Sequence, residues 1–276
     1  MKMEGKIALV AGASRGIGLA IARRLSGEGV QLVLPWHDDR PDDSRAMCEE
    51  FCGGENKHIA VRTDLRKIED VKNLARTIKQ KCGHLHILIN NIERGGMPVI
   101  HGSYEHLVNK DQWLLEMETT LLAKRLLFEQ SLPLLRKADN ASVINISSIA
   151  GLTGRSGPTG HIFSDGYAAA NRGIASLTET WARLAAPRIR VNEIMLGLID
   201  TRHGRDTRGW GELSDTIRKQ LTDHILLKRT GSPEEVAETV LFLVRDASYM
   251  TGSTIRLDGG YMLGSDSVPE MPEGIL

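Results

Sequence analysis

The glycine-rich segment at residues 10–18, VAGASRGIG, constrains this chain more than any other feature. An apolar run at residues 7–10 precedes it and an amphipathic run at residues 19–25 follows, so the segment predicts a strand that turns directly into a helix. Such a turn exposes backbone N–H groups at the positive end of the helix, where a phosphate is stabilised. The flanking strand and helix therefore favour a nucleotide-binding turn over a purely structural one. The residues expected at the nucleotide are Gly12, Ser14, Arg15, Gly16, Ile17 and Gly18.

Strand-like apolar runs alternate with longer, helix-like segments along most of the chain. The strand-like runs lie at residues 7–10, 31–34, 58–62, 86–90, 142–146, 188–194 and 254–257. Residues 111–135 and 167–186 have helical periodicity, and Ser232 followed by Pro233 marks a further helix start. The alternation predicts an α/β fold with one doubly wound, parallel Rossmann sheet and ligands beyond the carboxyl ends of its strands. We expect one domain over residues 1–263 and a C-terminal tail at residues 264–276.

Composition narrows the possible partners. Lysine plus arginine equals aspartate plus glutamate at 35 each, so the net charge is zero and no basic stripe indicates nucleic acid. No apolar run reaches the length of a membrane span, and the first residues lead directly into a strand, so we expect a cytoplasmic protein. Cys48, Cys52 and Cys82 have no histidine at ligand spacing, so we expect reduced thiols and no metal site.

Other motifs accompany the Gly12-x-x-x-Gly16-x-Gly18 spacing. They are Asp64-Leu65, Asn90-Asn91, Ile144 to Ser148, Tyr167, Ile189 to Asn192, Arg229 to Ala237, Thr251-Gly252 and Asp258 to Gly260. Together they make the chain resemble the short-chain dehydrogenase/reductase family from about residue 5 to about residue 263. The resemblance implies an NAD(P)(H)-dependent oxidoreductase that interconverts a ketone and a secondary alcohol. It also implies a homo-oligomer, a tetramer or a dimer, built through the helices at 111–135 and 167–186.

The resemblance also indicates which nicotinamide cofactor to expect. The family places an acidic residue at the end of the second strand, whereas this chain has Pro35-Trp36-His37 there. Arg15 stands where NADP-using relatives hold the 2′-phosphate with a guanidinium, and His37 or Arg40 could assist it. We therefore favour NADP(H), while NAD(H) stays possible with Asp38 as the ribose acceptor.

Further cofactor contacts are implied by position. Asp64 and Leu65 match the residues that meet the adenine ring, although Asp64 could also serve as a helix N-cap. Asn90 matches the residue beside the adenosine ribose. Ile199 and Thr201 match the residues that touch the nicotinamide amide.

The family's reaction centre is only partly present. Ser148 matches the serine that bonds the carbonyl oxygen, and Tyr167 matches the tyrosine that acts as the acid. Asn171 replaces the lysine expected four residues after the tyrosine, and Thr120 stands where the relay asparagine belongs. The retained serine and tyrosine favour an enzyme, whereas the two losses favour a nucleotide-binding subunit or sensor without turnover.

Other residues are candidates to replace the missing lysine. Lys124 lies one helical turn after Thr120, and His161, Asp165, Glu93 and Arg94 lie on adjacent loops. Each is more typical of a solvated or interface side chain than of a catalytic group. Tyr167 lies 19 residues after Ser148, more than is usual in the family, so the segment 151–166 must bulge over the site or be rearranged.

Overall fold

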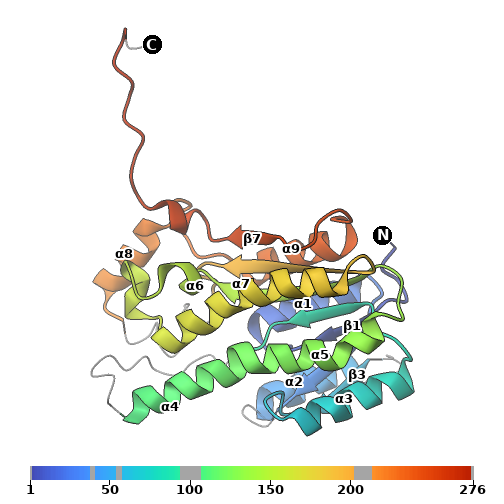
Figure 1. The fold of residues 1–276 in the computed structure, drawn as a ribbon. Helices are drawn as coiled ribbons and strands as arrows, with labels where there is room; N and C mark the ends of the chain where they lie inside the picture. Colours follow the sequence, from blue (N-terminus) through green and yellow to red (C-terminus); the bar gives the residue numbers. More distant parts are fainter. Residues whose placement is uncertain (1, 38–40, 54–57, 94–106, 202–212, 275–276) are drawn as a thin grey trace.

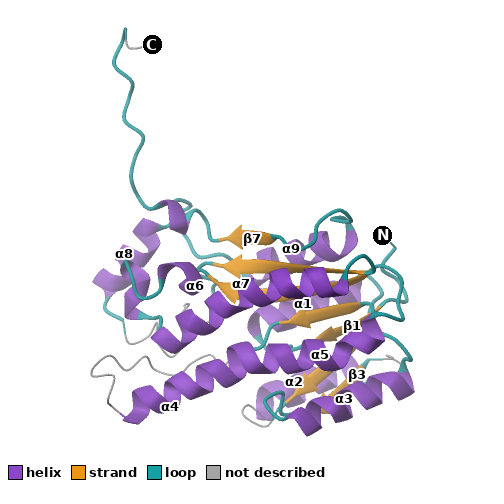
Figure 2. Cartoon of the chain, viewed as in Figure 1, coloured by secondary structure: helices purple, strands orange, loops and turns teal. Residues whose placement is uncertain are grey.

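The computed structural model describes residues 2–37, 41–53, 58–93, 107–201 and 213–274, and these form one parallel sheet flanked by helices (Figures 1 and 2). Seven strands pair in the order β3-β2-β1-β4-β5-β6-β7, all parallel. Their bounds are β1 Ile7–Val10, β2 Gln31–Trp36, β3 Ile59–Arg62, β4 Ile87–Asn90, β5 Ala141–Ser148, β6 Ile189–Leu196 and β7 Thr254–Leu257. The predicted doubly wound fold is confirmed.

Helices cover both faces of the sheet. The main ones are α1 Gly16–Gly27, α2 Pro41–Cys52, α3 Ile68–Lys81, α5 Ala123–Leu135, α7 Asp165–Ala185 and α9 Pro233–Arg245. Side chains alternate along a strand, so Ala8 and Val10 enter the core under α1 and α9 while Ile7 and Leu9 enter the core under α3, α5 and α7. Strands buried on both faces explain the nearly unbroken apolar runs of the sequence.

Several predicted bounds differ from the structure. β5 and β6 each run two residues beyond the predicted ends, because Ser147 and Ser148 continue the ladder although their side chains are polar. The helix predicted at 111–135 begins earlier, as α4 Leu107–Glu116, and passes through the π-helical segment Met117–Leu122 before α5. A π-helical segment changes the number of residues per turn, and a regular apolar period does not reveal it. Ser232 caps α9, as predicted.

The long segment between Ser148 and Tyr167 is folded. It forms the short helices α6 Ala150–Thr153 and η2 Pro158–His161. Ile149, Ile162 and Phe163 join a third apolar cluster with α8 Asp215–His224 and the η4 segment Tyr261–Leu263. The Tyr261 hydroxyl accepts from Thr159 N and donates to Thr159 Oγ1, both at 3.1 Å. The extra residues are thus rearranged into structure against the C-terminal part of the chain.

The final described segment leaves the body of the protein after η4 and runs outward without helix or strand (Figure 1). Val268 and Met271 are exposed there. The division into a domain at 1–263 and a tail at 264–276 stays a prediction. A helix long and apolar enough to cross a membrane is not found in the described part of the chain.

Candidate active site

The predicted site residues converge on one edge of the sheet. The strand order reverses between β1 and β4, which creates a crevice at their carboxyl ends. The glycine turn follows β1, His37 follows β2, and Asp64 follows β3. Asn90 and Ser148 end β4 and β5, and residues 197–201 follow β6. Parallel pairing therefore collects segments that are far apart in the sequence.

The glycine turn leaves no room for side chains. Gly12 has a φ of +70°, and a Cβ atom there would lie 2.2 Å from the Asn91 carbonyl oxygen. A Cβ atom on Gly18 would lie 2.0 Å from the Gly12 carbonyl oxygen. At Gly16, with a φ of +53°, a Cβ atom would lie 3.1 Å from Thr201 Cγ2, so Thr201 lies against the turn. A side chain at Gly12 or Gly18 would displace the turn itself, so glycine keeps bare backbone N–H groups at the start of α1. This cradle fits a dinucleotide phosphate.

The neighbouring end of the crevice is rich in positive charge. Arg66 Nε and Nη2 donate to the two carboxylate oxygens of Asp64, both at 2.8 Å, and these bonds lower the pKa of Asp64 to about 2. His37 Nε2 lies 3.7 Å from Asp64 Oδ2, and Arg15 is the half-buried N-cap residue of α1. Asp64 is not a helix N-cap: α3 begins at Ile68 after Lys67, and the carboxylate instead accepts from Arg66 N at 3.1 Å. Asp38 and Arg40 lie outside the described residues.

Asn90 is fully buried and connects structural elements. Its Nδ2 donates to Asn145 Oδ1 at 2.9 Å, and Asn145 Nδ2 donates to Thr178 Oγ1 at 2.8 Å. These bonds link β4, β5 and α7. Asn90 Oδ1 has no hydrogen-bond partner among the described residues. The predicted contact of Asn90 with a ribose stays a prediction, as do those of half-buried Leu65 and buried Ile199.

The structure brings Ser148 and Tyr167 together. Ser148 is the last residue of β5, and its Oγ accepts from Ala150 N at 3.1 Å, which leaves its proton for another acceptor. Tyr167 lies on the first turn of α7, which Ser164 caps by accepting from Tyr167 N at 3.1 Å. The Ser148 side chain hydrogen-bonds with the Tyr167 hydroxyl. The two predicted hydroxyls therefore form one pair at the carboxyl edge of the sheet.

Burial governs the acidity of this pair. It raises the pKa of the Tyr167 phenol well above its usual value, while hydrogen bonds from Ser148 and Asn171 act in the opposite direction. The Asn171 side chain is almost completely buried, and its Nδ2 donates to the Tyr167 carbonyl oxygen at 2.9 Å. An amide at this position supplies hydrogen bonds but no positive charge. Tyr167 therefore keeps its proton at neutral pH.

Thr120 lies in the π-helical segment, fully buried, and its Oγ1 donates to Glu116 Oε2 at 3.5 Å. Glu116 is only 7% exposed, and its charge also raises the pKa of Tyr167. Sequence reasoning missed Glu116. The available signal was its spacing: a carboxylate four residues before Thr120 lies on the same side of a helix.

The expectation for Lys124 was wrong. Lys124 is buried rather than solvated, and its Nζ donates to the Ile146 carbonyl oxygen at 2.7 Å. Burial lowers the pKa of this ammonium to about 7, and the nearby Glu193 carboxylate opposes the shift. Glu193 is itself fully buried and accepts from Ser147 Oγ and from Thr254 Oγ1, the latter at 2.6 Å. The helical pattern alone predicts that a lysine at this position is solvated. The burial of Lys124 depends on the packing of α5 on β5, which the pattern does not show.

The other candidates to replace the family's lysine differ in exposure. His161 is exposed, and half-buried Asp165 lies 3.9 Å from Arg155. Glu93 is half-buried, and Arg94 lies outside the described residues.

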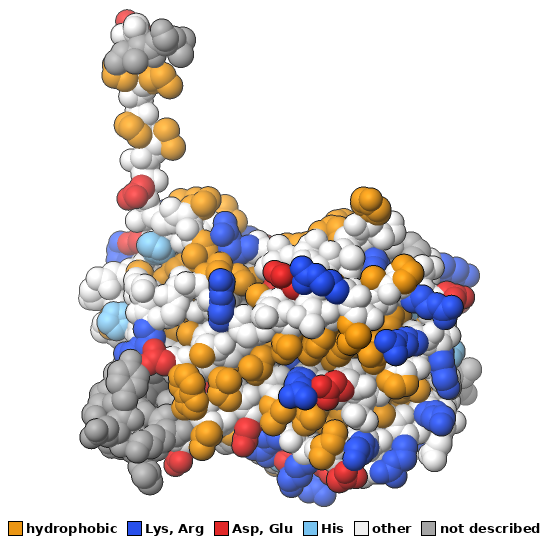
Figure 3. Space-filling view, viewed as in Figure 1, with side chains coloured by type: hydrophobic (Ala, Val, Ile, Leu, Met, Phe, Trp, Pro, Cys, Tyr) orange, Lys and Arg blue, Asp and Glu red, His pale blue; other side chains and the backbone are white. Residues whose placement is uncertain are grey.

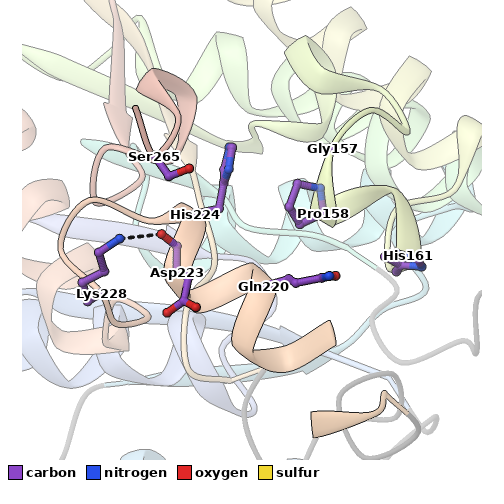
Figure 4. A pocket seen from close by; sticks show the side chains of 8 residues that line it. All are labelled: Gly157, Pro158, His161, Gln220, Asp223, His224, Lys228 and Ser265. Atoms are coloured by element: carbon purple, nitrogen blue, oxygen red, sulfur yellow. Dashed lines mark hydrogen bonds between the residues drawn. The ribbon is translucent and has the colours of Figure 1, made fainter. Parts of the chain in front are cut away.

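A cavity of about 670 Å³ lies between the rearranged segment and α8 (Figure 4). Pro158 and His161 line one side, and Gln220, Asp223 and His224 project from α8. The lining is polar and carries both signs of charge.

Known proteins resemble this chain over most of its length. The family model described as enoyl-(acyl carrier protein) reductase matches residues 12–262. The 3-oxoacyl-(acyl-carrier-protein) reductase FabG of Thermotoga maritima is 30% identical over 267 residues, covering 95% of this chain and 100% of the relative. The Vibrio harveyi protein of the same name is 31% identical over 266 residues, covering 95% of this chain and 100% of the relative.

A solved structure supports the same fold. The blue fluorescent protein from a metagenomic library, in complex with NADPH, has a TM-score of 0.79 at 24% identity and covers 95% of this chain and 99% of its own. The family model and the two relatives, which are matched over their whole length, show that the sequence is similar as well as the fold. This chain belongs to the short-chain dehydrogenase/reductase family.

Proposed function

We propose that this protein is an NADP(H)-dependent oxidoreductase that reduces a ketone to a secondary alcohol and catalyses the reverse reaction less readily. The hydrogen-bonded pair of Ser148 and Tyr167 carries the proposal, because it lies at the same sheet edge as the glycine cradle. Both of these relatives are named as reductases of an oxoacyl group, which favours an enzyme over a subunit without turnover.

Each side chain of the pair has a distinct role in this proposal. A bound nicotinamide would supply the hydride that the carbonyl carbon accepts. Tyr167 donates its phenolic proton to the carbonyl oxygen, which becomes the alcohol oxygen. Ser148 donates a hydrogen bond to the same oxygen and stabilises the negative charge that develops there. Asn171 holds the first turn of α7 through the Tyr167 carbonyl.

The preference for NADP(H) rests on charge at the adenosine end. Arg15 and His37 can pair with a 2′-phosphate, and Asp64, whose carboxylate Arg66 already pairs, adds little repulsion. NAD(H) stays the alternative. We propose a small-molecule carbonyl substrate, and the 3-oxoacyl thioesters indicated by the relatives' names belong first in any panel.

We also propose self-association through α4, α5 and α7. A band of hydrophobic side chains crosses this face (Figure 3). On these helices and the π-helical segment between α4 and α5, Trp113, Leu114, Leu122 and Leu184 are exposed. Sedimentation velocity would measure the assembly, and a monomer at all concentrations would contradict the proposal.

Tyr167→Phe tests the proposed reaction directly. Loss of the acid should lower kcat by about 10²- to 10⁴-fold and leave NADPH affinity nearly unchanged. Tyr249→Phe is the matched control, because Tyr249 is fully exposed. Steady-state kinetics and calorimetry measure the two quantities. Normal kcat in Tyr167→Phe would overturn the role of Tyr167. Tight NADPH binding without turnover of any ketone or alcohol would instead favour a nucleotide-binding subunit.

A further inference from the structure

Glu116 is a buried carboxylate that the proposed reaction leaves without a role. It ends α4, is 7% exposed, and accepts from Thr120 Oγ1 at 3.5 Å. A carboxylate loses much of its hydration on burial, so its place in the fold must be supported by polar neighbours. Thr120 is one such neighbour, and it occupies the position expected for the relay asparagine.

The packing of α4 brings Glu116 close to the reacting end of the site. At Gly166, a Cβ atom would lie only 3.0 Å from Trp113 Cα, so α4 and the first turn of α7 are in direct backbone contact. Glu116 lies one helical turn after Trp113 and therefore lies beside the same first turn. Tyr167 immediately follows Gly166, and the charge of Glu116 acts on its phenol.

Few other charges lie on α7 and the π-helical segment Met117–Leu122, which pack against α4, or on α5, which continues that segment. Glu118 in the π-helical segment is exposed. On α7, Arg172, Glu179 and Arg183 are exposed, and half-buried Asp165 lies 3.9 Å from Arg155. On α5, Arg125 and Glu129 are exposed. Lys124 is buried there, but its Nζ donates to the Ile146 carbonyl oxygen at 2.7 Å. Within the described parts of these helices, Glu116 and Lys124 are the two buried groups that can carry charge, and of the two it is Glu116 that acts on the Tyr167 phenol.

The inference rests on the proposed function, in which Tyr167 is the acid. We propose that Glu116 is a positioning residue that keeps the proton on Tyr167, and that it replaces the missing lysine as the controlling charge with the opposite sign. A lysine ammonium would stabilise the tyrosinate, whereas a carboxylate disfavours a second negative charge nearby. Thr120 orients that carboxylate through its hydrogen bond. A carboxylate in place of the ammonium suits a site in which Tyr167 donates a proton to a ketone.

The test places one trifluorotyrosine at position 167. Its phenol is several pH units more acidic than that of tyrosine, and its fluorine NMR signal belongs to this residue alone, so its titration can be followed without substrate. Glu116→Gln should lower the pKa of the fluorinated phenol by about one pH unit, because it removes the charge and keeps the shape. Glu118→Gln, two residues along the same helical stretch and exposed, should leave the pKa unchanged.

Two further variants separate charge from shape. Glu116→Asp keeps the charge and should retain most of the raised pKa. Glu116→Leu is a second charge-free variant, and it should shift the pKa in the same direction as Glu116→Gln if the latter does not fold. The proposal is overturned if the charge-free variants titrate with the wild type, or if Glu116→Asp shifts as far as Glu116→Gln.

The readout also separates this inference from the proposed function. A shift in Glu116→Gln without turnover of any substrate would refute the proposed reaction and support Glu116 as the controlling charge. Turnover without a change in the pKa of the fluorinated phenol would support the proposed reaction and refute Glu116 as the controlling charge. In an active enzyme, Glu116→Gln should move the basic limb of the reduction profile to lower pH, with a smaller change in KM than in kcat at alkaline pH.

Discussion

The two ends of the crevice differ in what holds them together. At the cofactor end, Gly12 and Gly18 are required by backbone contacts, since a Cβ atom at either would lie 2.2 Å or less from a carbonyl oxygen. At the reacting end, Ser148 and Asn171 hydrogen-bond with Tyr167, and Thr120 hydrogen-bonds with Glu116, whose charge acts on Tyr167. Backbone contacts admit one residue type, whereas a hydrogen-bonded network can exchange one polar partner for another.

This contrast explains where the chain keeps the family pattern and where it departs from it. The glycine turn follows the pattern because a substitution would displace the backbone itself. The sequence predicts that Asn171 and Thr120 depart from it, and in the structure Asn171 contacts Tyr167 while Thr120 contacts Glu116, whose charge acts on Tyr167. In the proposed site, the negative charge of Glu116 acts on Tyr167 where the family resemblance implies a positive one.

The largest effect is expected at the cofactor end. In Gly18→Ala, the new methyl group would lie 2.0 Å from the Gly12 carbonyl oxygen, so the turn must move. We expect NADPH affinity to fall by more than about a hundredfold, a loss of about 3 kcal/mol, together with a lower melting temperature. Calorimetry and thermal unfolding measure both.

Gly27→Ala is the matched control for this prediction. Gly27 ends the same helix and has nothing within 4 Å of a Cβ atom, so alanine should stabilise the fold slightly by about 0.5 kcal/mol. If Gly18→Ala bound NADPH as tightly as Gly27→Ala, the cradle would not be a phosphate site.

Arg15→Ala sharpens the comparison within the cofactor end, because it alters a charge and leaves the backbone contacts intact. Loss of a charged contact with the 2′-phosphate should weaken NADPH binding by about ten- to a hundredfold and leave NADH binding nearly unchanged. Calorimetry with both cofactors measures the preference. Arg45→Ala, an exposed arginine on α2, is the control. An unchanged preference in Arg15→Ala, or equal affinities in the wild type, would refute the assignment of NADP(H).

Asp64→Asn probes stability at the same end. The pKa of Asp64 falls from its usual value to about 2 because Arg66 pairs with it, so the carboxylate contributes about 2 kcal/mol to the free energy of unfolding at neutral pH. That contribution is present above about pH 4 and is lost as the pH falls through about 2. Denaturant unfolding should therefore show a deficit in Asp64→Asn at pH 7 that shrinks on acidification. The control is Asp42→Asn, with its exposed carboxylate; an equal deficit there would contradict the account.

The two ends also differ in what the sequence could predict. The glycine turn is local, so its spacing and flanks are sufficient to predict it. The family resemblance matches Thr201 to the nicotinamide amide, and in the structure Thr201 lies against Gly16. The family resemblance also matches Ser148 and Tyr167, and the shared role that it implies for them places both at one carbonyl oxygen. Glu116 and Lys124 were not predicted as buried charges, because their burial depends on the packing of α4 and α5 against α7 and β5. Periodicity assigns a charged residue to solvent unless a tertiary contact says otherwise.

Asn171→Lys tests the reacting end with the smallest expected effect. The wild-type Tyr167 holds its proton to high pH, so reduction should stay active well into the alkaline range and oxidation should rise only there. A lysine ammonium beside the phenol would stabilise tyrosinate and move the basic limb of both pH profiles to lower pH by about one unit. Equilibrium links the two directions at any one pH, so the profiles are compared between proteins and not between directions.

The matched control is Asn171→Met, which has similar length and no charge, and thermal unfolding must show that both variants fold. Asn171 Nδ2 donates to the Tyr167 carbonyl oxygen, and both substitutions remove that amide donor; lysine adds an ammonium, and methionine adds neither charge nor donor. If the basic limb of the pH profiles moves in Asn171→Lys and does not move in Asn171→Met, the ammonium causes the shift. If neither limb moves while the wild type oxidises alcohols freely at neutral pH, another group sets the proton chemistry. The comparison between the two ends of the crevice would then be wrong for the reacting end, because Asn171 would not act through Tyr167.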